Sequence, residues 1–474
     1  MSSSVQTSRA SADALSQPTL CAAFQLVAQR DPDGVALETF GASEPVTWRR
    51  FAERVRGLTG GLHALGVGHD DTVAILLRNR PVFNVVDTAA LHLGAVPFSL
   101  YATEPVEQMV ALVADSRAQV IVTEAHFLDK VRAVATRSPG VRHVIVEDSA
   151  ELDGPELALA AVEQAAPDGF DFENTWRGVQ EEMIATLVYT SGTTGAPKAV
   201  QISHRAIMNS LRGVDHHVSA DPHRGVSFLP AAHITDRFIC HYSTLGLGGR
   251  LVCVPDPDDL WEAIATTRPT RFFGVPRTCE KLAGRARSLI DADSALGEAL
   301  AVGYERVRAE QTGRELSPER AAAAGAAHAA LAPVREHLGL DQVQWFAVAA
   351  APTAYEVLEF HHAVGLNLAE LWGMSEFMMA TMNPPDRIKL GTVGIPLPTV
   401  QVDIAGDGEL LLRGGHACSG YRNDPERTAQ MRDGDGWVHS GDLAGIDGDG
   451  YLKIIGRKKE QMINSSGKNL VPVK

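Results

Sequence analysis

Cysteine is scarce in this sequence and follows no pattern. The 474 residues contain five cysteines, with no CxxC pair and no metal-ligand spacing: Cys21, Cys240, Cys253, Cys279 and Cys418. An odd, scattered set argues against a disulfide framework and indicates reduced thiols in a cytosolic setting. We therefore predict that each cysteine is a small buried hydrophobic residue.

Long apolar runs and an excess of basic charge are also lacking. No run of about 18 apolar residues occurs, and the polar N-terminus has no apolar core of the kind a signal peptide needs. We predict a soluble, cytoplasmic protein with at most peripheral membrane contact, and a disordered segment over residues 1–18. The formal net charge of -15 argues against nucleic acid as the main partner.

Apolar runs of strand length alternate with helical patterns through most of the chain. "TVAILL" (72–77) precedes a helix that starts at Pro81, and similar runs recur at "QVIVTE", "RLVCVP", "RFFGVP", "VQWFAVAA" and "LNLAELW". Apolar strands separated by helices predict parallel sheets covered on both faces. Residues 281–340, rich in Ala, Glu, Arg and Leu, predict two or three helices. From about residue 391, alternation and turn signals predict a small antiparallel β-unit.

The stretch "LVYTSGTTGAPKAV" (187–200) joins a strand-like run to a loop rich in Thr, Ser and Gly. Successive backbone N–H groups with hydroxyls beside them suit a polyphosphate, and Lys198 adds a positive charge. After the loop, Ser203 is predicted to cap a helix that Gly213 closes. The P-loop pattern GxxxxGK[ST] does not fit, and a purely structural Gly/Ser/Thr loop is the alternative.

The order Thr-Ser-Gly-Thr-Thr-Gly-x-Pro-Lys (190–198) resembles the phosphate-binding signature of the adenylate-forming (ANL) superfamily. This superfamily includes AMP-dependent long-chain fatty acyl-CoA synthetases, luciferases and peptide-synthetase adenylation domains. Further motifs are similar to the family's and follow in its order over roughly residues 40–474. They are "FLPAAHITDR" (228–237), "FFGVPRTCEKL" (272–282), "AVAAAPTA" (347–354), "ELWGMSEF" (370–377) and "WVHSGDLAGIDGDGYLKIIGRKKE" (437–460).

The resemblance implies an α/β fold with a large N-terminal domain of two doubly wound mixed sheets plus a small β-unit. The implied domains are an adenylation core (19–390), a β-rich subdomain (391–455), a hinge (456–460) and the start of a C-terminal domain (461–474). Relatives continue after the hinge into a mobile lid, whereas this sequence stops at Lys474. We expect the lid to be essentially missing, by truncation or natural shortening, and ligation to be impaired because a preorganised cation is lost.

The resemblance also implies a two-step reaction that needs no protein nucleophile. A fatty acid carboxylate attacks the α-phosphate of ATP, giving an acyl-adenylate and pyrophosphate, and the thiol of coenzyme A then displaces AMP. Charge builds on phosphoryl and carbonyl oxygens, so catalysis rests on positioning and electrostatic stabilisation. The implied partners are a fatty acid, ATP, Mg²⁺ and coenzyme A.

Roles carried over to this sequence place the polyphosphate on the loop from Thr190 to Lys198. The loop contacts are Ser191, Gly192, Thr193, Thr194, Gly195 and Lys198. Glu376 holds Mg²⁺ with help from the Thr190 hydroxyl, because oxygen ligands suit this hard ion. The hydroxyl of Ser375 serves the α-phosphate, and His233 lies beside the acyl and phosphate site, with a satisfied core histidine as the alternative.

Further roles concern the nucleoside and the hinge. Asp442 accepts hydrogen bonds from the ribose hydroxyls, Arg457 adds a forked cation, and Lys459 occupies the hinge position. A solvated charge run is the alternative for both basic residues. The adenine contacts are Ala350, Ala351, Pro352, Trp372, Gly373 and Met374. Four histidines without a role are expected at the surface or in loops: His216, His217, His361 and His362.

Two departures from the family pattern lie at the adenine site. Trp372 replaces the usual tyrosine, and an indole can stack on the base equally well. Ala349 replaces a common glycine. The substrate's chain length stays open, and two alternative functions remain: a fatty acyl-AMP ligase that loads a carrier protein, and a non-catalytic acyl- or nucleotide-binding protein.

Overall fold

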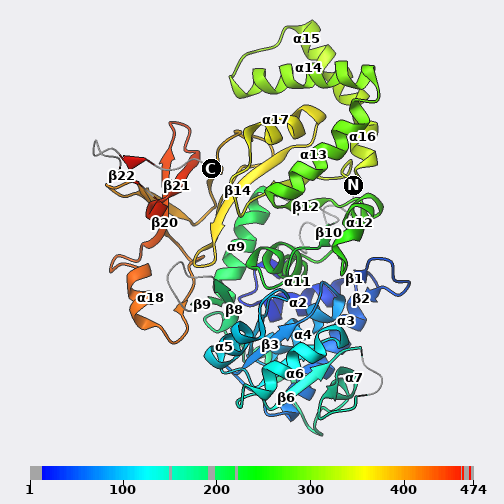
Figure 1. The fold of residues 1–474 in the computed structure, drawn as a ribbon, viewed down its shortest axis with the longest axis vertical. Helices are drawn as coiled ribbons and strands as arrows, with labels where there is room; N and C mark the ends of the chain where they lie inside the picture. The colour runs from blue at the N-terminus through cyan, green and yellow to red at the C-terminus, as the bar shows by residue number, and fades with distance from the viewer. Residues whose placement is uncertain are drawn as a thin grey trace. The chain divides into compact units, whose positions relative to one another are not determined.

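The structure is a computed structural model that describes residues 13–148, 152–190, 198–218, 223–460, 462–463 and 469–470. Two compact units make up the chain, and each is described by itself (Figure 1). Unit 1 comprises Met1–Arg212, Val226–Asp259 and Ala417–Gln430. Unit 2 comprises Gly213–Gly225, Leu260–His416 and Met431–Lys474.

A five-stranded parallel sheet forms the centre of unit 1, in the order β4-β3-β5-β6-β7. Its strands are β3 (Thr72–Leu76), β4 (Val96–Ser99), β5 (Val120–Thr123), β6 (His143–Val146) and β7 (Leu157–Ala158). The crossover helices are α4 (Pro81–His92), α5 (Val106–Ser116) and α6 (Leu128–Thr136). Since β4 and β5 flank β3 on opposite sides, the strand order reverses at β3. Pro81 stands in the first turn of α4, as predicted.

One face of this sheet packs into an apolar core. Met109 and Leu112 from α5 and Val131 from α6 lie in one buried cluster with Phe98 of β4 and Ile121 of β5. Every residue of β3 is buried, because a central parallel strand is covered on both faces. The continuous apolar runs of the sequence therefore occupy the positions that the pattern predicts.

Two smaller sheets complete the strands of unit 1, in the orders β10-β11-β1-β2 and β19-β9-β8. Their strands are β1 (Val35–Thr39), β2 (Val46–Thr47), β10 (Arg224–Ser227), β11 (Arg250–Cys253), β8 (Ile184–Thr190), β9 (Lys198–Ser203) and β19 (Gly420–Tyr421). The remaining helices are α2 (Leu20–Arg30), α3 (Trp48–Ala64), α7 (Leu159–Glu163), α8 (Phe172–Arg177), α9 (His204–His217), α10 (Ile234–Asp236), α11 (Ser243–Leu247) and α18 (Pro425–Met431). A π-helix, η2, covers Arg237–Tyr242.

The chain is already folded before residue 19. Ala14 and Leu15 are buried. The Arg212 guanidinium donates 2.7 Å hydrogen bonds to the carbonyl oxygens of Leu15 and Gln17. The disorder predicted over 1–18 therefore does not extend to residues 13–18, because this arginine satisfies their carbonyls. Residues 1–12 lie outside the described part.

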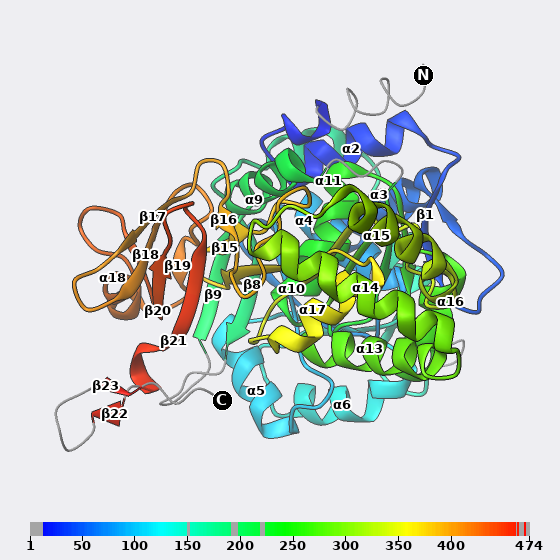
Figure 2. The same cartoon turned by 90° about the horizontal axis from the view of Figure 1, so that it is seen from above.

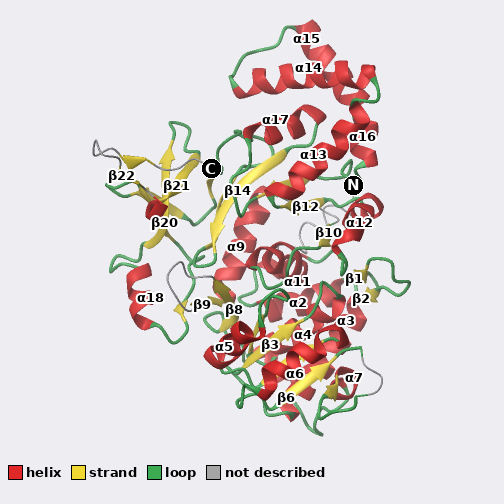
Figure 3. Ribbon diagram, in the orientation of Figure 1, coloured by secondary structure: helices red, strands yellow, loops and turns green. Residues whose placement is uncertain are grey.

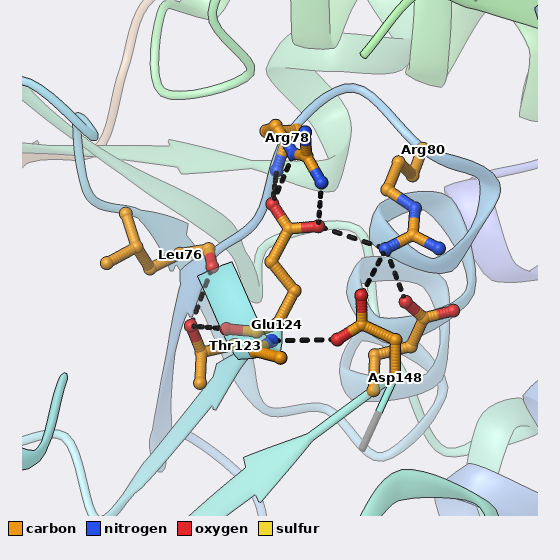
Figure 4. Close-up of polar contacts among 8 residues, drawn as sticks. Leu76, Arg78, Arg80, Thr123, Glu124 and Asp148 are labelled. Carbon is orange, nitrogen blue, oxygen red and sulfur yellow. Dashed lines mark hydrogen bonds and ion pairs between the residues drawn. The ribbon is translucent and has the colours of Figure 1, made fainter. Parts of the chain in front are cut away.

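In the described part of unit 1, two ionic clusters form around a fully buried carboxylate, Asp87 or Glu124. In the first, Arg237 of η2 pairs with Asp87 of α4, and the other carboxylate oxygen of Asp87 lies 3.0 Å from Nε2 of His241. In the second, at the carboxyl ends of β3 and β5, the fully buried Glu124 accepts hydrogen bonds from Arg78 and Arg80 (Figure 4). Such pairs are strongly destabilising to break, because the remaining charge is buried alone.

Unit 2 holds a mixed sheet in the order β12-β13-β14-β15-β16. Its strands are β12 (Arg271–Gly274), β13 (Trp345–Val348), β14 (Leu368–Met374), β15 (Met378–Met382) and β16 (Ile395–Pro396). The first three are parallel and the last two antiparallel. Its helices, red in Figure 3, are α12 (Leu260–Thr267), α13 (Pro276–Ile290), α14 (Ser294–Gln311), α15 (Pro318–Ala330), α16 (Ala332–His337) and α17 (Tyr355–Val364).

A small antiparallel sheet, orange to red in Figure 2, follows in the order β17-β18-β20-β21. Its strands are β17 (Gln401–Ile404), β18 (Glu409–Arg413), β20 (Val438–Ile446) and β21 (Leu452–Arg457). After the short helix η4 (Lys458–Glu460), β22 (Met462–Ile463) pairs with β23 (Asn469–Leu470). The predicted β-unit after residue 391 is confirmed.

The predicted α/β architecture is confirmed, and so is the burial of all five cysteines. Two local predictions are wrong. Ser203 caps α9, but the helix continues through Gly213 to His217. His361 and His362 are buried, because the second half of α17 is buried on all sides within unit 2. Among the described residues, no helix has both the length and the apolar character to cross a membrane.

Candidate functional site

Thr190 and Lys198 close the base of the hydroxyl-rich loop in unit 1. They are opposite each other where β8 and β9 pair in antiparallel register. The Nζ atom of Lys198 lies 5.3 Å from the ring centroid of Tyr421 on β19, within the range of a cation–π contact. The predicted contacts Ser191, Gly192, Thr193, Thr194 and Gly195 lie outside the described residues.

Side chains of β8 anchor the strand that leads into this loop. The Tyr189 hydroxyl donates to Oδ2 of Asp115 at 2.8 Å, and the Thr186 hydroxyl donates to the Pro97 carbonyl at 2.8 Å. The first bond reaches α5, and the second reaches β4 of the five-stranded parallel sheet. Thr190, the last residue of β8, therefore starts the loop from a fixed point.

His233 stands at the N-cap of α10, also in unit 1. Its Nδ1 accepts a 3.1 Å hydrogen bond from the backbone N–H of Thr235, so the neutral ring carries its proton on Nε2. Burial lowers the pKa of His233, which favours this neutral form. The histidine therefore caps α10 through Nδ1 and carries an N–H donor on its other ring nitrogen.

Sequence reasoning missed Asp236, three residues after His233. Oδ2 of Asp236 accepts a 2.9 Å hydrogen bond from Ser227, and Asn79 donates to the same hydroxyl at 2.8 Å. Burial raises the pKa of Asp236 to about 7. The run "HITDR" carries an acid and a base, but only the fold shows that both Asp236 and Arg237 turn inward.

A tight hairpin in unit 2 presents Ser375 and Glu376. β14 and β15 are joined by a turn over residues 375–377, and both side chains there are partly exposed. The next residue, Phe377, is fully buried and stacks on His416 with ring centroids 6.0 Å apart. The buried ring anchors the turn that carries the Ser375 hydroxyl and the Glu376 carboxylate.

Gly373 is required by this hairpin. A Cβ atom at position 373 would lie 2.2 Å from the carbonyl oxygen of Met378, far inside van der Waals contact. Met378 itself has φ of 52°, a left-handed conformation that only a few per cent of non-glycine residues adopt. The "WGMSE" order therefore encodes a close crossing of two backbones as well as side-chain chemistry.

The predicted adenine loop follows the neighbouring strand. β13 runs parallel to β14 with Val348 opposite Glu370, so Ala350, Ala351 and Pro352 come after the carboxyl end of β13. All three are exposed. Ala350 has φ of 74°, a conformation that glycine adopts without strain. The site residues of unit 2 thus gather at the carboxyl ends of adjacent parallel strands, where α/β sheets bind ligands.

Trp372 and Arg457 both engage the carboxylate of Asp442. The indole N–H of Trp372 donates to Oδ2 of Asp442 at 3.0 Å. The Nε atom of Arg457, opposite Asp442 in the β20–β21 ladder, lies 2.9 Å from Oδ1. Burial raises the pKa of Asp442, and the arginine and the indole oppose this effect. The structure therefore brings together three predicted residues from three strands.

Glu409, which sequence reasoning missed, ties the hinge to the strand that carries Asp442. Its carboxylate accepts hydrogen bonds from Lys458 Nζ at 2.7 Å, His439 Nδ1 at 3.2 Å and the backbone N–H of Gly441 at 2.9 Å. Burial alone would raise the pKa of Glu409, but these donors hold it below its usual value. Lys459 is exposed in η4. The clamped lysine of the hinge is Lys458.

The two predicted magnesium ligands, Thr190 and Glu376, carry oxygen donors. Within the described ranges, no group of three or more His, Cys, Asp and Glu side chains could hold a metal ion. Thr190 and Glu376 offer a hydroxyl and a carboxylate, which are the hard oxygen donors that Mg²⁺ prefers. Each of these side chains therefore suits a Mg²⁺ ion that takes phosphate oxygens and water as its other ligands.

Comparisons with known proteins bear on the family and the fold of the chain. The family described as AMP-binding enzyme matches residues 24–422. The putative fatty-acid–CoA ligase fadD11 of Mycobacterium tuberculosis is 41% identical over 317 residues, covering 65% of this chain and 56% of the relative. The long-chain-fatty-acid–CoA ligase heimdall of Drosophila melanogaster is 31% identical, covering 90% of this chain and 66% of the relative. The chain thus spans between half and two thirds of these relatives.

A solved structure supports the fold. ATP-bound MatB from Rhodopseudomonas palustris matches with a TM-score of 0.74 at 23% identity, covering 96% of this chain and 81% of that one. At this identity the likeness concerns the fold alone.

Proposed function

Because this chain belongs to the AMP-binding enzyme family, we propose that it is an AMP-forming acid–thiol ligase that activates a long-chain fatty acid with ATP and passes the acyl group to coenzyme A. The observation that carries the proposal is the buried Asp442 carboxylate, held by Trp372 and Arg457 beside the rigid Ser375–Glu376 turn. Relatives named as long-chain-fatty-acid–CoA ligases support the substrate class.

The proposal assigns the triphosphate to the loop between Thr190 and Lys198. Ser191, Gly192, Thr193, Thr194 and Gly195 offer backbone N–H groups and hydroxyls to the β- and γ-phosphates, and Lys198 adds its charge. Thr190 and Glu376 hold Mg²⁺, which would neutralise phosphate charge when bound.

The nucleoside is assigned to the residues of unit 2. Asp442 accepts the ribose hydroxyls, Trp372 supplies an aromatic wall for adenine, and the exposed backbone of Ala350–Pro352 borders the base, with Gly373 and Met374 completing the strand. Arg457 opposes the effect of burial on the pKa of Asp442, which favours the ionised carboxylate, and supplies a forked cation near the sugar and α-phosphate.

Reaction then depends on orientation. The Ser375 hydroxyl donates a hydrogen bond to the α-phosphate. The Nε2–H of the neutral His233 donates a hydrogen bond to the acyl carboxylate or to the phosphate. No side chain forms a covalent bond with substrate, so rate enhancement comes from placing the acid in line with the phosphorus. Lys459 serves as pivot between the half-reactions within a hinge at 456–460, and the protein acts in the cytoplasm with peripheral membrane contact.

Pyrophosphate release from ATP and Mg²⁺ tests the proposal. We expect release to require a fatty acid and to vary with chain length, and the nucleotide product to be AMP. Glu376→Gln should reduce release about 100-fold or more, since a preorganised electrostatic contact to the transition state is lost. The matched control Glu336→Gln changes an exposed carboxylate on α16 and should leave release unaffected. Acid-independent formation of ADP would refute the assignment.

The same assay identifies the acceptor of the acyl group. With coenzyme A present, an acyl thioester and free AMP should form in equal amounts. Stable acyl-adenylate that coenzyme A does not consume would indicate a ligase that loads a carrier protein. ATP binding without pyrophosphate release would indicate a non-catalytic binding protein.

A further inference from the structure

We propose that Trp372 is a positioning residue that sets the sugar specificity of this site. Its indole N–H orients the Asp442 carboxylate so that the oxygens keep free acceptor positions for both ribose hydroxyls. The inference rests on the proposed function only in taking Asp442 as the ribose-binding group. The feature in question is the indole N–H of Trp372, which stacking on adenine does not require, because any aromatic ring can stack on the base.

The acceptor capacity of Asp442 is the first step. An ionised carboxylate has about four lone-pair positions on its two oxygens. Among the described residues, one position on Oδ2 is used by Trp372 Nε1 at 3.0 Å, and one on Oδ1 faces Arg457 Nε at 2.9 Å. One position on each oxygen is left. Two vicinal hydroxyls, such as the 2′- and 3′-hydroxyls of ribose, match this pattern, whereas a single hydroxyl leaves one position unsatisfied.

The two donors are themselves held in place by backbone pairing. Trp372 lies in β14 with Thr381 of β15 opposite it, and the close backbone approach at Gly373 fixes the strand directly after it. Asp442 lies in β20, opposite Arg457 of β21. The hydrogen bond from Trp372 to Asp442 thus links the mixed sheet to the small antiparallel sheet.

Without the indole donor, the Asp442 carboxylate would keep only its contact with Arg457. Asp442 is buried, whereas the Arg457 side chain is 59% exposed and can move in solvent. Rotation about the terminal carboxylate bond is broad and roughly two-fold, so one contact from a mobile partner leaves it loosely defined. The indole, part of a strand interior, is the contact that fixes the plane of the carboxylate.

Equilibrium binding of Mg-ATP, 2′-deoxy-ATP and 3′-deoxy-ATP tests the inference without requiring turnover. The parent chain should prefer ATP over either deoxynucleotide. Trp372→Phe keeps an aromatic face but removes the donor, so it should lower that preference about tenfold or more, as for one hydrogen bond to a charged group. Trp437→Phe is the matched control, because this tryptophan of the same unit packs under Arg413 and should leave the preference unchanged.

A purely structural or stacking role gives a different result. If Trp372 only stacks on the base or joins two sheets, Trp372→Phe weakens all three nucleotides equally and the ratio is unchanged, which overturns the inference. Should the phenylalanine variant fail to fold in a thermal unfolding control, benzothienylalanine at position 372 removes the N–H at constant shape. Nucleotide binding with the expected ratio but no pyrophosphate release would refute the ligase function and leave the inference standing.

Discussion

Buried histidines should make this protein lose stability as the pH falls below 6.5. Of the seven buried histidine side chains, His362 among them, six have a strongly lowered pKa: His92, His204, His223, His241, His361 and His416. Burial lowers the pKa of three of them, His92, His361 and His416, to about 4, and that of His204 to about 3. Burial also places the pKa of His223 and His241 well below 6.5.

The size of the effect follows from proton linkage. At pH 5.5 each of these histidines binds about 0.9 proton in the unfolded chain and almost none in the folded protein. Asp236 and Glu370 act in the opposite direction, because burial raises their pKa to about 7 and the fold keeps them protonated. Three of the histidines and one of the acids belong to each unit, so unfolding either unit should take up about two protons. The stability of each unit should then fall by about 2.5 kcal/mol per pH unit near pH 5.5.

Calorimetric unfolding at pH 5.5, in two buffers of different ionisation enthalpy, measures this uptake directly. His416→Gln should remove about one proton from the uptake of unit 2, since the substituted side chain does not titrate. Near pH 8 the histidines are neutral in both states, and their contribution should vanish. An uptake below one proton for the whole chain at pH 5.5, or a stability that stays constant between pH 7.5 and 5.5, would refute the reasoning.

Other substitutions test single contacts by equilibrium unfolding. Asp87→Ala leaves the Arg237 guanidinium buried without its counter-charge and should cost about 3–5 kcal/mol, so a loss under about 1 kcal/mol would contradict the pair's importance. Ala350→Gly should stabilise unit 2 by up to about 1 kcal/mol, because φ of 74° strains alanine. The control Ala326→Gly, at an exposed position inside α15, should destabilise unit 2 by a similar amount. A change of stability of the same sign in both variants would contradict the strain at Ala350. Gly394→Ala places a Cβ atom 1.9 Å from a backbone carbon and should prevent a stable fold of unit 2, and a normal melting temperature would show that the backbone can yield.

Local patterns predicted the elements well, because strand periodicity and capping act within a few residues. The apolar runs occupy the strands, Pro81 starts α4, and Ser203 caps α9. The end of α9 was predicted wrongly, since packing carried the helix past Gly213 despite its low propensity. Local chemistry thus decides where an element begins more firmly than where it ends.

The candidate site was predictable only as a set of residue types. Trp372 and Asp442 are 70 residues apart in sequence, so no local pattern predicts that the indole donates a hydrogen bond to the carboxylate. Glu409 lies 49 residues from Lys458 and begins a strand whose sequence, ELLLR, gives no sign of that partner. Partners of this kind are set by which strands the fold places together. The roles of Ser191 to Gly195, outside the described residues, stay predictions.

The Glu124 cluster has a consequence for what the parallel sheet of unit 1 can accept. In doubly wound sheets of this strand order, the crevice beyond β3 and β5 is where ligands commonly bind. Here Glu124 itself fills the role of a bound anion, with the Arg78 backbone N–H at 3.2 Å, its Nε at 2.8 Å and Arg80 at 3.0 Å. Because Glu124 already neutralises part of the charge of these two arginines, this edge of the sheet should attract a phosphate less strongly than two unpaired arginines would.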